Sequence, residues 1–262
     1  MVLRGTLQIN NELIQRRRRR KVVKRSIVFS TLLISLLVIL CLKLSYFNVS
    51  NIVILNNEII NTEEILELSK INKGTNIFYM DLKNIQTNVL SNPYILKANV
   101  KRKLPNTISI EVQEREAVFY AKNESGNLII DRLGVVLEKK DDTSGMNLTN
   151  LTGIDFGGAK VGKVIPCDDN RKINFITEIT DLIEANTSGI KITSVDLSDF
   201  LDIKIYSNNI CIKVGDNSNL ENKLNEALNI IVNNKLVNSI GYIDVSFQGN
   251  PVVHVEKQEE TE

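Results

Sequence analysis

Hydrophobic residues first form one long apolar run near the N-terminus. Ser26 to Leu42 gives seventeen uncharged, mostly apolar residues, and continuing to the aromatic pair Tyr46 and Phe47 gives twenty-two. At about 1.5 Å per residue, a helix of that length spans roughly 33 Å, close to the thickness of a bilayer's hydrocarbon core. The run therefore predicts a membrane-spanning helix over 26–47, with Lys43 reaching the headgroups and the aromatic pair at the interface.

Two other structures compete with this interpretation. A buried core helix would normally have a polar face, which the run lacks. A cleaved signal peptide would share the basic start, but this apolar run is long and no small-x-small cleavage motif follows it. Cys41 follows Leu40, where bacterial lipid attachment needs a small residue. We interpret the run as an uncleaved anchor.

After the run, segments of helical and of alternating periodicity follow one another in about seventy residues. In residues 107–114, Ile108, Ile110 and Val112 lie on one face of an expected strand and polar residues on the other. The predicted order is β-α-α-β-β: a strand over 49–55, a helix that Asn61 or Thr62 caps and that 72–74 end, a helix from Asp81 to before Pro93, and strands over 95–103 and 107–114.

The part of the chain after the apolar run divides near residues 117–123, and a second group of elements follows. Ser218 and Glu221 have the spacing of a capping box at the start of the last helix. The expected elements are a hairpin over 127–138, a helix over 168–186, three short strands within 192–216, a helix over 218–234 and two closing strands over 241–249 and 251–257. This pattern predicts a mixed α/β domain.

Charge divides the chain on either side of the apolar run. Residues 1–25 contain nine Lys or Arg, five of them at 16–20, and one acid, Glu12; this segment carries +8, the remainder −7, and the total is +1. Basic residues beside a span stay in the cytoplasm, which places residues from 48 onward outside. A nucleic-acid patch or nuclear signal would use the same residues, but their position favours membrane orientation and anionic headgroups.

Composition adds that most of the 262 residues should fold, since 43% are hydrophobic and 24% charged. Tryptophan is absent and aromatics make up 5%. Few stacking platforms are therefore available for single-stranded nucleic acid.

Groups suited to catalysis are few. His254, the sole histidine, lies in an alternating strand. Asp131, Asp196 and Asp244 follow apolar segments and could pair as acid and base, but each also suits a turn or strand end where it bonds to backbone. We expect no catalytic, cofactor or metal site.

Two further motifs resemble a phosphate-binding loop and a redox or metal site, but each lacks residues that such a site requires. Residues 157–163 approximate a phosphate-binding loop, but Val164 stands where Ser or Thr must bind magnesium. Cys167 and Cys211 form no CxxC motif, so a disulfide and two separate thiols both remain open.

The segment 92–116, NPYILKANVKRKLPNTISIEVQERE, resembles the signature of the FtsQ/DivIB family of bacterial cell-division proteins. Leu104 departs from it, since many relatives have tryptophan there, and Glu116-Ala117 stands where many have a proline. The closing stretch GYIDVSFQGNPVV is also similar, and the resemblance covers nearly the whole chain. The signature positions are Pro93, Tyr94, Ala98, Val100, Arg102, Pro105, Ile110, Val112, Glu114 and Arg115.

The resemblance implies an α+β protein: an N-terminal transmembrane helix, a β-α-α-β-β POTRA domain, and a mixed α/β C-terminal domain of sheet and helices. The implied divisions are a basic cytoplasmic tail (1–25), the transmembrane helix (26–47), the POTRA domain (48–117), the FtsQ/DivIB-type β domain (118–256) and a short acidic tail (257–262). The implied function is a non-enzymatic scaffold of septum formation in the cell membrane at the division septum, with no cofactor.

The implied partners are small bitopic proteins like FtsL and FtsB (DivIC in Firmicutes), with the septal peptidoglycan synthase as a further candidate. A strand of such a partner can add to a free edge of the closing strands. The expected contact residues are Tyr242, Val245, Phe247, Val252, Val253 and His254, supported by the helix from Leu220. The charges at 101–103 and 114–116 are expected to stay in water, as a docking face or hinge.

Two other classes of protein are alternatives. A POTRA-type polypeptide receptor in protein export or envelope assembly usually carries several such units before a barrel, and this chain has one unit behind an inner span. A receptor for wall polymers would need an aromatic platform, which the sequence does not provide.

Overall fold

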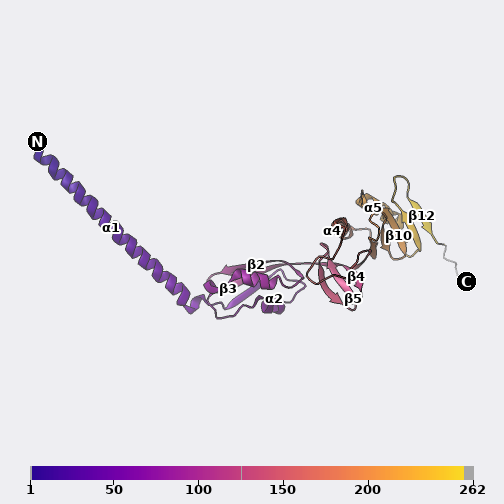
Figure 1. Ribbon diagram of the computed structural model, residues 1–262, viewed down its shortest axis with the longest axis horizontal. Coiled ribbons are helices and arrows are strands. Elements are labelled where there is room, and N and C mark those ends of the chain that lie inside the picture. Colours follow the sequence, from indigo (N-terminus) through magenta and orange to yellow (C-terminus); the bar gives the residue numbers. More distant parts are fainter. Residues whose placement is uncertain (1, 125, 257–262) are drawn as a thin grey trace. The chain divides into compact units, whose positions relative to one another are not determined.

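The computed structural model describes residues 2–124 and 126–256, with side chains from Arg18 onward. The acidic tail predicted at 257–262 and the side chains of Arg4, Arg16 and Arg17 lie outside the described residues. The predicted α+β class is confirmed, with an apolar N-terminal helix followed by two sheets (Figure 1). The chain forms two compact units: the first comprises 1–57, 61–88 and 98–112, and the second 58–60, 89–97 and 113–262.

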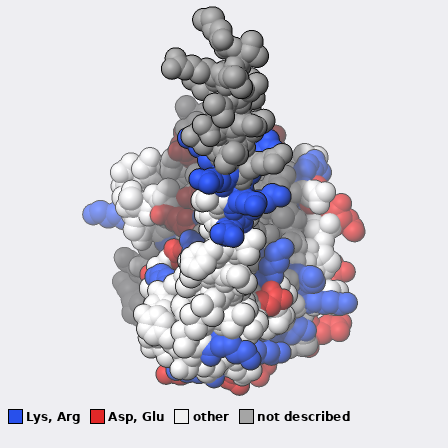
Figure 2. Space-filling model, turned by 90° about the vertical axis from the view of Figure 1, so that its left-hand side faces the viewer, with Lys and Arg blue, Asp and Glu red and all other residues white. Residues whose placement is uncertain are grey.

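The first helix, α1 (Val2–Lys43), contains a segment, Arg18–Lys43, that is long and apolar enough to cross a membrane and is not buried against the protein. Figure 2 shows Lys and Arg side chains gathered on this helix next to the atoms drawn in grey, with white side chains beyond them. This helix fits a single-pass membrane protein. The α-helix ends at Lys43, and the short 3₁₀-helix η1 (Ser45–Phe47) carries the aromatic pair that the sequence placed within the span.

The rest of the first unit has the predicted β-α-α-β-β order. Its elements, of which residues 89, 95–97 and 113–114 belong to the second unit, are β1 (Asn51–Leu55), α2 (Thr62–Ser69), the 3₁₀-helix η2 (Ile77–Tyr79), α3 (Leu82–Val89), β2 (Ile95–Lys103) and β3 (Thr107–Glu114). In the described residues these strands form a sheet in the order β1-β3-β2, with β1 parallel to β3. Ile108, Ile110 and Val112 are buried, as the alternation predicts.

A side-chain cap sets the start of α3, and a left-handed backbone conformation sets the end of α2. Asp81 Oδ1 accepts hydrogen bonds from the backbone N–H groups of Lys83 and Asn84, which caps the start of α3. Asn61 is the N-cap residue of α2 but makes no side-chain cap bond. Lys70 adopts a left-handed conformation, so α2 stops at Ser69, before the turn at 72–74 where the sequence placed its end.

The second unit contains nine described strands in one sheet, in the order β12-β11-β10-β9-β8-β7-β4-β5-β6. Residues 117–123, where the sequence placed a divide, form the interior strand β4, which pairs with β5 on one side and β7 on the other and buries Phe119 and Ala121. The strands are β4 (Ala117–Asn123), β5 (Gly126–Asp131), β6 (Val136–Lys140), β7 (Thr149–Thr152), β8 (Ser194–Asp196), β9 (Ile203–Ser207), β10 (Ile210–Gly215), β11 (Gly241–Asp244) and β12 (Val252–Val255).

Two helices, α4 (Asn170–Ala185) and α5 (Leu220–Asn233), supply much of the core of this unit. Their buried residues join one apolar cluster with alternate residues of the strands, such as Ile212 and Ile243. Lys213 and Tyr242, which are adjacent to Ile212 and Ile243 in the same strands, are only half-buried. Since side chains alternate between the two faces of a strand, the second face of β10 and β11 remains accessible.

The capping box predicted for α5 does not form. Ser218 donates its hydroxyl to Asp216 Oδ1, which also accepts from the Ser218 N–H at 3.2 Å. Asn219 becomes the N-cap residue, in a left-handed conformation and without a side-chain cap bond. Asp216 thus competes successfully for the hydroxyl that the capping box requires.

Candidate functional site

Strand β12 lies at one end of the large sheet, and within the described residues its one strand neighbour is β11. The two strands are antiparallel, with Ile243 opposite Val253 and Tyr242 opposite His254. An edge strand leaves one row of backbone N–H and C=O groups without ladder partners. This edge is the candidate functional site.

The register shows which backbone groups of β12 face outward. Glu256 N–H donates to the Ile240 carbonyl at 2.9 Å, in line with the β11–β12 register. Hydrogen-bonded and non-bonded pairs alternate along antiparallel strands. His254 and Val252 therefore bond toward β11, whereas Val253 and Val255 direct both their N–H and C=O groups to the open side.

The opposite edge of the sheet, β6, is protected in two ways. The segment 162–164 covers its start, because Val136 N–H donates to the Lys163 carbonyl at 2.9 Å and Gly162 N–H donates to the Val136 carbonyl at 2.7 Å. The rest of the strand carries Glu138, Lys139 and Lys140, and charges of this kind discourage strand addition. Strand β12, with the sequence VVHV, has no such charge.

The six residues expected to contact a partner occupy three environments. Phe247, Val252, Val253 and His254 are exposed, with Val253 43% accessible. Tyr242 is half-buried. Val245 is 4% exposed and belongs to the core, so its side chain is not available to a partner.

A cluster that the sequence did not reveal lies on the accessible face beside this edge. The rings of Tyr242 and His254 are stacked, with centroids 5.3 Å apart, and Lys213 Nζ lies 4.0 Å from the centre of the Tyr242 ring. This geometry is a cation–π contact. The cluster gives the edge a polar, aromatic border on one face.

The signature residues of the first unit have structural roles. Arg102 donates from Nε to the Ile77 carbonyl at 2.8 Å and from Nη2 to the Met80 carbonyl at 2.6 Å, which holds the turn at η2. Pro105 follows a cis peptide bond, and Val100 is half-buried. Arg102 is exposed, as expected of the basic run, but its guanidinium also braces a turn.

Glu114, expected to stay in water, instead binds three successive backbone N–H groups. Its Oε2 accepts from Glu58 at 3.0 Å and Ile59 at 2.7 Å, and its Oε1 accepts from Ile60 at 3.0 Å. A carboxylate receiving three backbone bonds fixes the loop before α2. The sequence could not show this, because 54 residues separate Glu114 from Ile60.

Arg115 is also paired rather than solvated. Its Nη1 lies 2.6 Å from Asp131 Oδ2, and Asp131 is 2% exposed. Asp131 Oδ1 accepts from the N–H groups of Leu133 at 2.9 Å and Val135 at 2.7 Å. The turn role expected of Asp131 is present, with an ion pair added to it.

Tyr94 joins the same region. Its ring packs against a cluster that includes Ile129 and Leu137, and its hydroxyl donates to Glu138 Oε1 at 2.8 Å. Pro93, beside it, is half-buried. Burial raises the pKa of the Tyr94 hydroxyl, and the hydrogen bond to Glu138 and its negative charge add to the effect.

We expect Tyr94→Phe to lower the stability of the second unit by about 1 kcal/mol at neutral pH, because one partly buried hydrogen bond is lost and the ring is kept. A raised pKa in the folded state stabilises the fold below the unfolded-state pKa of about 10, and this contribution is lost as the pH rises above it. Urea unfolding at neutral and alkaline pH should show the variant and the parent chain converging at high pH. An equal difference at every pH would contradict this role.

The carboxylates considered for acid–base catalysis serve backbone turns. Asp196 Oδ1 accepts from the Ser198 N–H and hydroxyl, and Asp244 Oδ1 does the same with Ser246. Partial burial opposes the effect, but the hydrogen bonds from Ser198 lower the pKa of Asp196 below its ordinary range. A carboxylate held ionised in a turn is poorly suited to act as a general acid.

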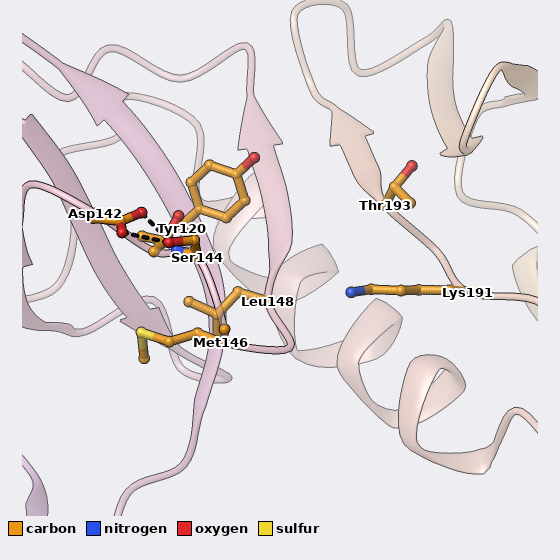
Figure 3. Close-up of a pocket in the computed structure, with 9 residues that line it drawn as sticks. Tyr120, Asp142, Ser144, Met146, Leu148, Lys191 and Thr193 are labelled. Atoms are coloured by element: carbon orange, nitrogen blue, oxygen red, sulfur yellow. Dashed lines mark hydrogen bonds between the residues drawn. The ribbon is translucent and has the colours of Figure 1, made fainter.

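One pocket of about 420 Å³ lies in the second unit. Figure 3 shows Tyr120, Met146 and Leu148 on one side of it and Lys191 and Thr193 on the other. Its carboxylate, Asp142, accepts hydrogen bonds from Ser144, which lower the pKa of Asp142. Asp142 and Ser144 are bonded to each other within a local turn, and the nine lining residues include no histidine or cysteine.

Metal-binding and redox groups do not converge in the described part of the chain. Within residues 2–124 and 126–256, no three His, Cys, Asp or Glu side chains gather as metal ligands. Cys167 and Cys211 are free thiols, which decides between the two states that the sequence left open. Burial raises the pKa of the Cys211 thiol, so it remains protonated.

Comparison with known proteins identifies similar sequences over most of the chain. The family described as "POTRA domain, FtsQ-type" matches residues 47–115, and "Cell division protein FtsQ/DivIB, C-terminal" matches residues 119–246. Cell division protein DivIB of Clostridium acetobutylicum is 44% identical over 220 residues, which cover 84% of this chain and 88% of that protein. DivIB of Clostridium botulinum strain Hall is 42% identical over 248 residues, covering 94% and 97%. DivIB of Bacillus subtilis is 32% identical over 143 residues, covering 53% and 54%.

Proposed function

Since this chain belongs to the FtsQ/DivIB family of cell-division proteins, we propose that it is a non-enzymatic scaffold that binds other division proteins through the edge strand β12. The observation that carries the proposal is the contrast between the two edges of the large sheet. Strand β6 is covered and charged, whereas β12 offers the outward backbone groups of Val253 and Val255. Such an edge suits the addition of a partner strand.

The partners that fit this edge are bitopic division proteins like FtsL and FtsB or DivIC, with the septal peptidoglycan synthase as a further partner of the assembly. Backbone bonds to β12 would give affinity, and the exposed side chains of Val252, Val253 and Phe247 would give selectivity. By holding these proteins together, the scaffold links early and late division proteins and helps control septal peptidoglycan synthesis.

The proposed topology has the N-terminus in the cytoplasm and residues after the span outside, at the septum. Its support is the distribution of charge: Arg18, Arg19, Arg20, Lys21, Lys24 and Arg25 are exposed directly before the apolar part of α1. Basic residues flanking a span remain on the cytoplasmic side.

A non-enzymatic role is supported by the positions of the residues considered for catalysis. Asp131 pairs with Arg115, and Asp196 and Asp244 hold turns. His254 stacks on Tyr242 at the partner edge. These residues have structural or binding roles in the scaffold.

The proposal predicts that a fluorescent protein fused to the N-terminus of the full chain gathers in a midcell band in dividing cells. If the fluorescent protein is one that does not fold after export, the signal also tests the orientation of the span. A uniform membrane signal in cells that are dividing normally would contradict the septal role. A control in which residues 48–262 are removed should give that uniform signal, because it keeps the anchor and lacks the edge.

A further inference from the structure

Within the first unit, the C-terminal end of α1 is held by one buried side chain, Asn76. Asn76 Nδ2 donates to the Cys41 carbonyl at 2.9 Å and to the Leu42 carbonyl at 3.3 Å. The last carbonyls of a helix have no partners within the helix, so Asn76 satisfies groups that would otherwise need water. Asn76 therefore lies level with the last turn of the membrane helix.

The backbone around Asn76 strengthens this attachment. Asn48, just after η1, pairs with Asn76 in an antiparallel bridge, and Val49 N–H donates to the Thr75 carbonyl at 2.9 Å. The second polar atom of Asn76, Oδ1, accepts from the Phe78 N–H at 3.0 Å. The Asn76 side chain thus joins the end of α1 to the first residues of the turn that follows Asn76.

That turn is η2, and it is held from its other side by Arg102. The guanidinium donates to the carbonyls of Ile77 and Met80, at 2.8 and 2.6 Å, and so spans both ends of the turn. Ile77 is buried beneath it. With Asn76 at its start and Arg102 across it, η2 has a fixed position beside the end of α1.

The fixed turn presents aromatic side chains to the outside. Tyr79 is 63% exposed, and the Phe78 ring lies 5.5 Å from the ring of Phe47 in η1. Phe47 in turn makes an edge contact, at 5.3 Å, with Tyr46, which is 65% exposed. Aromatic residues from two segments some thirty positions apart therefore meet where the membrane helix ends.

We propose that η2 is a second membrane contact, in which Phe78 and Tyr79 insert into the interfacial layer of the bilayer beside Tyr46 and Phe47. The occupant of this surface is lipid because the surface is continuous with α1, whose apolar segment ends at Lys43, level with Asn76. Aromatic rings, tyrosine above all, favour the headgroup region, where the ring is apolar and the hydroxyl is hydrated. The first unit is thereby held against the outer surface of the membrane at two points.

The test uses the absence of tryptophan from the chain. Tyr79→Trp creates a single tryptophan at an exposed position, and the full chain is placed in lipid nanodiscs made with ordinary phospholipid or with phospholipid brominated near the glycerol end of the acyl chains. Bromine quenches tryptophan on contact. The matched control is Leu201→Trp, at a position in the second unit that is 70% exposed.

We expect the tryptophan of the Tyr79→Trp variant to emit at shorter wavelength than that of the Leu201→Trp control. It should also lose most of its emission in brominated nanodiscs, while the control keeps its emission. Phe78→Trp should behave like Tyr79→Trp and provides a second reporter if one variant folds poorly. Equal emission of every variant in the two kinds of nanodisc would overturn the proposal. Blue-shifted emission without quenching would also overturn it, because the surface would then be covered by protein.

Discussion

Arg115→Met is expected to destabilise the second unit by about 3–5 kcal/mol, the usual cost of removing one partner of a buried ion pair. Asp131 is 2% exposed, and its Oδ2 lies 2.6 Å from the arginine. The backbone bonds from Leu133 and Val135 reach Oδ1, so they do not replace the lost partner. Methionine retains much of the apolar stem, which limits the change to the charge and its hydrogen bond.

The measurement is urea unfolding of the full chain in detergent, with hydrogen exchange of the β4 and β5 amides as a local probe. Arg132→Met is the matched control, because Arg132 pairs with Asp181 and Glu184 at the surface, where all three side chains are well exposed. Surface pairs contribute about 0–1 kcal/mol. If the two variants lost the same stability, the buried pair would not have the importance that its geometry suggests.

Arg115→Met combined with Asp131→Asn should recover part of the loss. Asparagine keeps an oxygen that can accept the bonds from Leu133 and Val135 but carries no charge to leave unpaired. Recovery in the double variant would show that the cost in Arg115→Met comes from the buried charge of Asp131 and not from the lost arginine stem.

Local sequence patterns predicted the helices and strands of the fold. The alternation in 107–114 predicted the buried residues of β3, and the pattern in 168–186 predicted the helix α4. These patterns work because burial on one face follows the geometry of the strand or helix itself. The sequence analysis also expected a free edge at the closing strands, and β12 lies at the end of the sheet formed by the described strands.

Contacts between residues that are distant in the sequence could not be predicted from local patterns. Lys213 and Tyr242 meet because β10 and β11 are parallel neighbours joined through α5, and no spacing along the chain indicates this. Asn76 resembles an ordinary turn residue, yet its amide reaches carbonyls 34 and 35 residues away. Charged residues such as Glu114 and Arg115 are normally expected to be exposed. Only the folded chain places backbone N–H groups beside Glu114 and a carboxylate beside Arg115.

The capping box at Ser218 shows a different kind of error. The spacing of Ser218 and Glu221 was correct for the motif, but Asp216, two residues earlier, is also a strong local acceptor. Short-range competition between two acceptable hydrogen-bond patterns is decided by backbone conformation, here the left-handed Asn219. A motif defined by residue types alone does not contain that information.

Val253→Pro is expected to weaken the binding of an FtsB- or DivIC-like partner by about tenfold or more, a free-energy change of about 1.4 kcal/mol or greater. The N–H of Val253 faces the open side of β12, so proline removes a donor that the partner would use and places its ring in the path of the incoming strand. No bond to β11 depends on that N–H. Proline is accepted in edge strands at such positions, and the sheet itself should remain folded.

Val253→Ala is the matched control, since it removes most of the same side chain and keeps the backbone donor. The extracytoplasmic segment of the partner, labelled with a fluorophore, is titrated with each full-length variant in nanodiscs, and hydrogen exchange of the β10 and β11 amides checks the fold. If binding depends on strand addition, the alanine variant should stay within a few-fold of the parent chain and the proline variant should not. Equal affinities of the two variants would exclude β12 as the strand that receives the partner, because the backbone of Val253 would then contribute nothing beyond its side chain.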